Sequence, residues 1–94
     1  MDINEIKHLI KSEILIERLE LEDVTEDEIQ DNENLYSEDG LGLDSVEALD
    51  IVDGISDVFK INAEVVLSTG EDNNFKTVNE IANYILLMSN NNEN

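Results

Sequence analysis

The chain offers few side chains that could carry out covalent chemistry. It contains no cysteine and a single histidine, His8, so a serine–histidine–acid set would depend on one base. His8 lies in a helical, lysine-flanked context, and we interpret it as a surface or boundary residue. The serine in the most suggestive setting is Ser45, in the segment GLGLDSVEALDIV at 40–52. A glycine-bearing stretch leads into Asp44 and Ser45 there, and a helical pattern begins at once.

Asp44 and Ser45 also suit a purely structural role at the start of this helix. Both residue types are preferred N-caps, because their side-chain oxygens accept hydrogen bonds from the free amides of the first turn. If Asp44 is the cap, Glu47 completes a capping box. Capping alone does not account for the whole segment GLGLDS, nor for the helix face beside it.

The helix that follows Ser45 is divided between an apolar half and an acidic half. On a helical wheel of residues 45–59, the apolar half consists of Leu49, Ile51, Val52, Ile55, Val58 and Phe59. The other half carries Glu47, Asp50, Asp53 and Asp57, with Val46 as an exposed apolar residue among them. Neighbouring acids at this spacing destabilise a helix by roughly 0.2–0.5 kcal/mol per pair. The acidic face beside Val46 therefore favours partner recognition over a merely solvated surface.

The net charge narrows the class of partner. The chain has 24 acidic and 5 basic residues, which gives a formal net charge of −19. No basic residue lies between Arg18 and Lys60. Nucleic acid and anionic membrane surfaces are disfavoured, because both are bound through clustered lysine and arginine. A protein with a basic patch is the expected partner, and the alternative is a charged surface that only keeps the protein soluble.

Apolar periodicity predicts an all-α fold, a four-helix bundle of three main helices and one short helix. In the first helix, residues 2–20, isoleucines recur at helical spacing, whereas Leu15 falls off their face. The second helix spans 45–59. A short third helix is predicted from its cap, Asn62, to Gly70, followed by a loop. The last helix starts at Thr77, which forms a second capping box with Glu80.

Two connecting segments have recognisable turn chemistry. Thr25 with Glu28 matches a capping box and predicts a short helical turn. Residues 30–43 read as a polar loop in which Gly40 and Gly42 supply turns or permit close backbone approach.

The length of 94 residues predicts one domain, residues 1–88, followed by a disordered tail, 89–94. No apolar run approaches the roughly 20 residues of a membrane span, and the first residues lack the pattern of a secretory signal. We expect a soluble, cytoplasmic monomer that does not insert into membranes. No metal site is predicted, because a calcium-loop pattern starting at Asp31 would place Leu35 and Tyr36 at its fifth and sixth positions.

The segment GLGLDSVEALDIV resembles the attachment-site motif of the acyl carrier protein family, the phosphopantetheine-binding carrier proteins. The resemblance extends over nearly the whole chain, through VTEDEI, through VFKI at the end of the second helix, and through FKTVNEIANYI in the last helix. It implies a four-helix fold and a non-catalytic carrier that serves partner enzymes.

Carried over by position, the resemblance implies that Ser45 is esterified by 4′-phosphopantetheine from coenzyme A, with Asp44 beside it. Partner enzymes with basic patches, among them a phosphopantetheinyl transferase and acyl-processing enzymes, would recognise the helix face formed by Val46, Glu47, Asp50, Asp53 and Asp57. Members of the family most often have leucine where this chain has Val46, and an apolar residue where it has Asp53. These differences favour a specialised carrier in fatty acid, lipid or polyketide biosynthesis. The alternatives are an aminoacyl or peptidyl carrier, and an acidic interaction domain without a prosthetic group.

Overall fold

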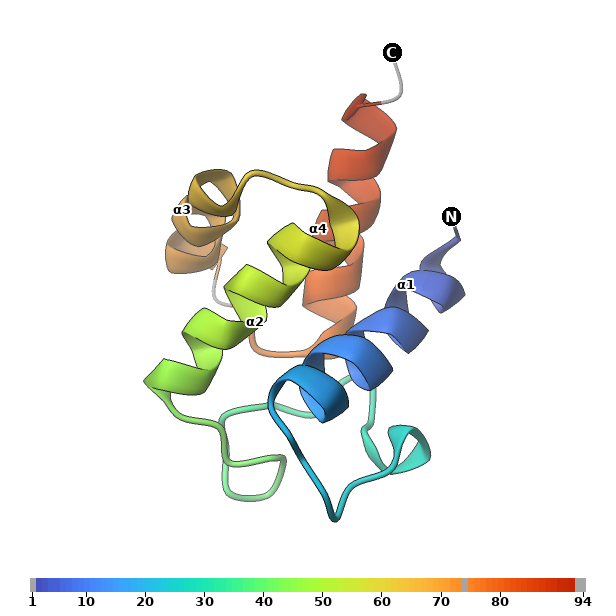
Figure 1. The fold of residues 1–94 in the computed structure, drawn as a ribbon, viewed down its shortest axis with the longest axis vertical. Coiled ribbons are helices and arrows are strands. Elements are labelled where there is room, and N and C mark those ends of the chain that lie inside the picture. The colour runs from blue at the N-terminus through green and yellow to red at the C-terminus, as the bar shows by residue number, and fades with distance from the viewer. Residues whose placement is uncertain (1, 74, 93–94) are drawn as a thin grey trace.

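The computed structural model describes residues 2–73 and 75–92, with side chains for 2–68 and 75–89 (Figure 1). Its helical elements are α1 Ile3–Leu9, the π-helix η1 Ile10–Arg18, the 3₁₀-helix η2 Glu26–Glu28, α2 Ser45–Phe59, α3 Ala63–Asn73 and α4 Val78–Asn92. The described part contains no strand, so the predicted all-α class is confirmed. Within it, no helix combines the length and the apolar composition needed to cross a membrane.

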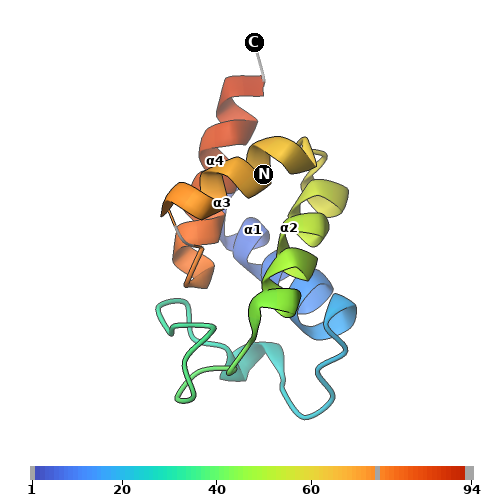
Figure 2. The ribbon, with the colours of Figure 1, turned by 90° about the vertical axis from the view of Figure 1, so that its left-hand side faces the viewer.

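The continuous α1–η1 segment contacts both α2 and α4, and α1 is seen between these two helices in Figure 2. After α2 the chain turns back, and α3 packs on α2 (Figure 2). The long connection from η1 to α2 gathers at one end of the molecule in both views. This end is where α2 begins, so the connection holds the residues that precede Ser45.

The core is made mainly of aliphatic side chains from α1, η1, α2 and α4. Its largest fully buried members are Ile6, Ile10, Ile14, Leu15, Ile29, Leu35, Ile51, Ile55, Val66, Val78, Ile81 and Ile85. Ile6, Ile10 and Ile14 of the first helix are therefore core residues, as their spacing predicts, whereas Ile3 and Ile16 are partly buried and pack against the core. Leu49 is the exception on α2, because its side chain is 55% exposed although the wheel places it on the apolar half.

Leu15 is fully buried, which contradicts its placement off the helix face. The reason is the backbone of η1, where amides bond to the fifth preceding carbonyl: Leu19 N lies 3.3 Å from Ile14 O, and Leu21 N lies 3.0 Å from Ile16 O. A wider turn rotates less per residue than an α-helix does. Two consecutive residues, Ile14 and Leu15, can then both face the core.

The helix ends differ from the predicted ones. Asn62 caps α3, since its Oδ1 accepts from Glu64 N at 2.8 Å, but α3 continues past Gly70 to Asn73. Glycine lowers helix stability by only about 1 kcal/mol and the sequence has no proline to stop the helix. The predicted end at Gly70 is therefore wrong.

The last helix is also longer than predicted. Thr77 Oγ1 accepts from Glu80 N at 3.1 Å, as expected of a cap, and α4 continues to Asn92. Residues 89–92 are thus helical where the sequence predicts a disordered tail, because an anchored helix extends at low cost per added residue. Residues 93 and 94 lie outside the described part.

Gly54 lies where α2 packs closely against η1. A Cβ at this position would lie 2.9 Å from Ile14 Cγ2 and 3.1 Å from Arg18 Cδ. Glycine in this helix is therefore a packing requirement, since Gly54 is buried and a larger residue would push the helices apart.

We expect Gly54→Ala to lower the free energy of unfolding by about 1 kcal/mol, measured by urea denaturation. Overpacking costs about 1–3 kcal/mol, which exceeds the roughly 1 kcal/mol that alanine gains in helix propensity. In an Ile14→Ala background the contacts with Ile14 are gone and only the flexible Arg18 side chain remains close, so the same substitution should stabilise. Stabilisation by Gly54→Ala in the otherwise native chain would contradict this account of the contact.

Candidate functional site

The start of α2 is fixed by Asp44, which resolves the choice of cap. Asp44 Oδ1 accepts from Glu47 N at 2.9 Å, and Asp44 N donates to Glu47 Oε1 at 3.1 Å. These two bonds form the reciprocal capping box. Ser45 is consequently the first helical residue, exposed, and its hydroxyl has no part in capping.

Gly40 and Gly42, which precede Asp44, are each required to be glycine for a different structural reason. Gly42 adopts φ +63°, in the left-handed region that favours glycine. A Cβ on Gly40 would meet the carbonyl oxygen of Asn34. Both amides bond to Ser37 O, at 3.0 Å from Gly40 N and 2.9 Å from Gly42 N. The stretch GLG is therefore a tight turn that sets the direction in which the chain enters α2.

The loop is also tied to the start of α4. Leu43 N donates to Leu35 O at 3.0 Å, and Leu35 N donates to Lys76 O at 2.7 Å. Leu35 and Leu43 are both buried. The residues just before Ser45 are thus connected to the core through two buried leucines.

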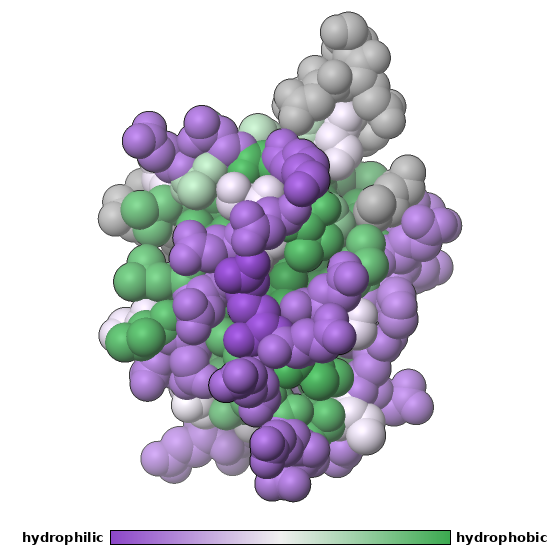
Figure 3. Space-filling view, in the orientation of Figure 1, coloured by the Kyte–Doolittle hydropathy of each residue, from purple (hydrophilic) through white to green (hydrophobic). Residues whose placement is uncertain are grey.

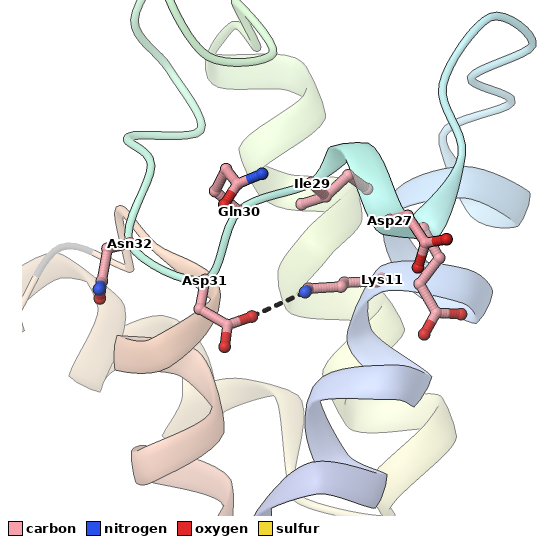
Figure 4. A pocket seen from close by; sticks show the side chains of 7 residues that line it. Lys11, Asp27, Ile29, Gln30, Asp31 and Asn32 are labelled. Atoms are coloured by element: carbon pink, nitrogen blue, oxygen red, sulfur yellow. Dashed lines mark ion pairs between the residues drawn. The ribbon is translucent and has the colours of Figure 1, made fainter.

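A second tie lies at a polar hollow of about 430 Å³ between η1, η2 and the loop (Figure 4). Lys11 Nζ lies 2.7 Å from Asp31 Oδ1, and Lys7 Nζ lies 3.2 Å from Asp31 Oδ2. The Asp31 carbonyl accepts from Asn79 N at 3.0 Å. Asp31 therefore joins the first helix to α4. The hydrogen bond from Lys11 is the main reason that the pKa of the Asp31 carboxyl lies below its usual value, and Lys7 lowers it further. Partial burial of the carboxyl raises its pKa, but by less.

The four acids of α2 have different environments. Glu47 belongs to the capping box, and Asp57 pairs with Arg18 of η1. Neither Asp50 nor Asp53 forms an ion pair with any described residue. Of the four acids on the predicted face, only Asp50 and Asp53 take part neither in a helix cap nor in an ion pair among the described residues.

Exposed apolar side chains accompany these acids. Val46 is 66% exposed, as the sequence predicts, and Leu49, Val65 and Leu67 are 55%, 42% and 41% exposed. Hydrophilic residues cover much of the face in Figure 3, and hydrophobic ones show at its left edge, where α3 and the start of α2 lie.

A groove runs between α2 and α3. It has a volume of about 250 Å³ and is lined by Leu49, Val52, Asp53, Ala63, Glu64 and Leu67. Leu49 is exposed because it forms one wall of this groove, where α3 does not close over α2. This is the physical reason for the misplaced core assignment of Leu49.

The chain matches no protein-family model, no curated protein and no solved structure in comparisons with each. Among the described residues, no group of three His, Cys, Asp or Glu side chains is arranged to hold a metal ion. The candidate site is therefore defined by its geometry: an exposed serine at a capped helix start, two unpaired carboxylates, and an apolar groove.

Two features of this region were missed by sequence reasoning. The α2–α3 groove has no local signal, because its walls are ten or more residues apart in the chain. The contact of Asp31 with two lysines has a partial signal in the sequence, since Lys7 and Lys11 are spaced by four residues and share a helix face. Nothing in the sequence identifies the acid with which they pair.

We expect Asp31→Asn to lower stability at neutral pH and to matter less in acid. Because its pKa in the folded chain is below the unfolded value of 3.8, the Asp31 carboxylate stabilises the fold above that pH, and the contribution is lost as pH falls through the lowered pKa. Urea midpoints of native and Asp31→Asn chains should therefore converge as the pH falls below the lowered pKa of Asp31.

Asp39→Asn is the matched control, because Asp39 is an exposed acid of the same loop that forms no ion pair with a described residue. The Asp39→Asn substitution removes one negative charge without removing an ion pair, so it should change the urea midpoint little. Equal effects of the two substitutions at neutral pH would mean that the lysine contacts do not stabilise the fold.

Proposed function

We propose that this protein is an acyl carrier whose Ser45 is esterified by 4′-phosphopantetheine and which holds acyl intermediates for partner enzymes. The observation that supports it most is the setting of Ser45: an exposed hydroxyl at the first residue of a helix whose capping is done by Asp44. The resemblance of GLGLDSVEALDIV to the attachment motif of acyl carrier proteins agrees with this setting. The chain has no cysteine, and the thiol that carries acyl groups would come with the prosthetic group.

The residues at Ser45 fit such a group. A phosphodiester on its oxygen would lie at a helix N-terminus, where free amides and the helix dipole favour an anion. The Asp44 carboxylate is turned toward Glu47 N, at 2.9 Å, so it is engaged in capping. In the transfer, the Ser45 oxygen would form a bond to phosphorus as the pyrophosphate bond of coenzyme A breaks, and 3′-phosphoadenosine 5′-phosphate would leave.

Partner recognition would use the exposed surface next to Ser45. Val46 and Leu49 supply apolar contact area, and Asp50 and Asp53 supply unpaired negative charge. Such a surface suits an enzyme with basic side chains around an apolar hollow, since opposite charges speed association and fix orientation. The assignment to fatty acid, lipid or polyketide synthesis follows from the resemblance alone.

An acidic interaction domain without a prosthetic group is the second candidate. It is favoured by the same two acids and by the exposed Val46, and it gives no role to the hydroxyl of Ser45. The two candidates differ in the mass of the protein after contact with coenzyme A and a transferase.

We expect the chain, incubated with coenzyme A and a broad-specificity phosphopantetheinyl transferase, to gain one phosphopantetheine. Digestion and mass spectrometry should find the group on the peptide containing Ser45. Ser45→Ala should abolish the gain, whereas Ser37→Ala should not. An unmodified native chain, or modification of the Ser45→Ala variant, would argue against attachment at Ser45.

We further expect Asp50→Lys to slow this modification several-fold at low salt, with the difference shrinking as salt is added, because exposed charges are screened within about 10 Å at 0.1 M. Glu13→Lys makes the same charge change on η1 instead of on the helix that begins at Ser45, and serves as the control. If both variants are modified equally fast, net charge rather than the α2 surface governs the rate. Circular dichroism would verify that both remain helical.

A further inference from the structure

The segment η1 has a helical register that is rare over such a length. It is a π-helix of nine residues, Ile10–Arg18, whereas π-helical geometry occurs mostly as single turns within α-helices. The α-helix α1 runs directly into it. The chain just after η1 is strained as well, because Glu20 has φ +56°, in the left-handed region that residues other than glycine seldom adopt. Local preferences therefore do not explain this register, and contacts with other elements must hold it.

Two contacts of η1 depend on its register. Leu15 is fully buried beside Ile14, which requires a turn that rotates less per residue than an α-helix does. Arg18, the last residue of η1, pairs with Asp57 near the end of α2. In the α-helical register the difference in rotation would accumulate along the segment. Leu15 would then turn out of the core, and Arg18 would turn away from Asp57.

Of these two contacts, the ion pair is the one that a partner can reach. The Arg18 side chain is 33% exposed and the Asp57 side chain is 68% exposed. Asp57 lies on the acidic face of α2, and its pairing with Arg18 shows that its carboxylate accepts a cation at this position. A partner's lysine or arginine would compete with Arg18 for this carboxylate. Such a partner binds more tightly to the form in which Arg18 has left, and a ligand shifts an equilibrium toward the form that it binds more tightly.

We propose that η1 is a two-register element, which passes from the π-helical to the α-helical register when a basic side chain of a partner pairs with Asp57. In the π form Leu15 is in the core and Arg18 is on Asp57. In the α form Leu15 is turned out and Arg18 is free. Binding at the acidic face of α2 is thereby coupled to the first helix. This coupling does not require a group on Ser45, so it goes beyond the proposed carrier function.

The test reads the register of η1 by nuclear magnetic resonance on the full, unmodified chain. Scalar couplings across hydrogen bonds identify the carbonyl that each amide meets. The Leu19 amide meets the Ile14 carbonyl in the π form, where Leu19 N lies 3.3 Å from Ile14 O, and would meet the Leu15 carbonyl in the α form. Saturation-transfer experiments quantify the minor form. A tetralysine peptide should lower the ratio of π to α form by up to about 5-fold, the effect of an exposed ion pair, and an uncharged tetraglutamine peptide should not.

Substitutions separate the two contacts. Leu15→Ala should lower the ratio of π to α form by more than tenfold, because the buried leucine is lost from the π form only. Ile6→Ala truncates an equally buried residue of α1, outside the π-helix, and should leave the ratio unchanged. Asp57→Asn tests the ion pair in a chain with a native core. It should lower the ratio by up to about 5-fold and abolish the effect of tetralysine, whereas Asp53→Asn should do neither.

Two results would overturn the inference. Absence of the α form from the native, Leu15→Ala and Asp57→Asn chains would mean that η1 has a single register. An α form whose fraction responds neither to Asp57→Asn nor to tetralysine would mean that the register is not coupled to a cation at Asp57. Neither result bears on attachment at Ser45, which the coenzyme A experiment tests separately.

Discussion

Burial of the aliphatic stripe on α1–η1 is the constraint on which the rest of the fold depends. Ile6, Ile10 and Ile14 are fully buried, and the segment that carries them contacts both α2 and α4. Burying one such side chain stabilises a fold by about 1.5–3 kcal/mol. This contribution is large compared with the margin of about 5–15 kcal/mol by which a domain is stable. The π-helical turn follows from the same demand, since it brings Leu15 into the core.

The scarce positive charges serve the architecture. With a formal net charge of −19, self-repulsion opposes compaction, and three of the five cations are placed where they join segments distant in sequence. Lys7 and Lys11 meet Asp31, and Arg18 meets Asp57. The acids left over include those near Ser45, so negative charge remains uncompensated where recognition is proposed. The positions of the few cations therefore determine both which segments are joined in the fold and where negative charge remains for the proposed recognition.

The region around Ser45 joins a rigid base to an open surface. The base is the capping box, the glycine turn, and the bonds from Leu43 and Leu35 to Lys76, all of which fix where α2 begins. The open part is the groove along α2, whose walls remain exposed to solvent. The proposed carrier function would need both properties, because the attachment point would be presented in one geometry to several enzymes while the cargo enters and leaves.

Features with local causes could be predicted from the amino-acid sequence alone. Capping chemistry placed the start of α2 between Asp44 and Glu47, helical spacing marked Ile6, Ile10 and Ile14 as core, and the acidic sector around Val46 was evident from a wheel. Contacts between distant segments account for the rest: that Leu15 is buried and Leu49 is exposed, and that Gly54 is needed for close packing. They also decide that Asp57 has a cation partner whereas Asp53 has none among the described residues. A periodic pattern describes one helix in isolation. Which side of that helix is covered, and which carboxylate finds a cation, depends on where η1 and α3 lie in space.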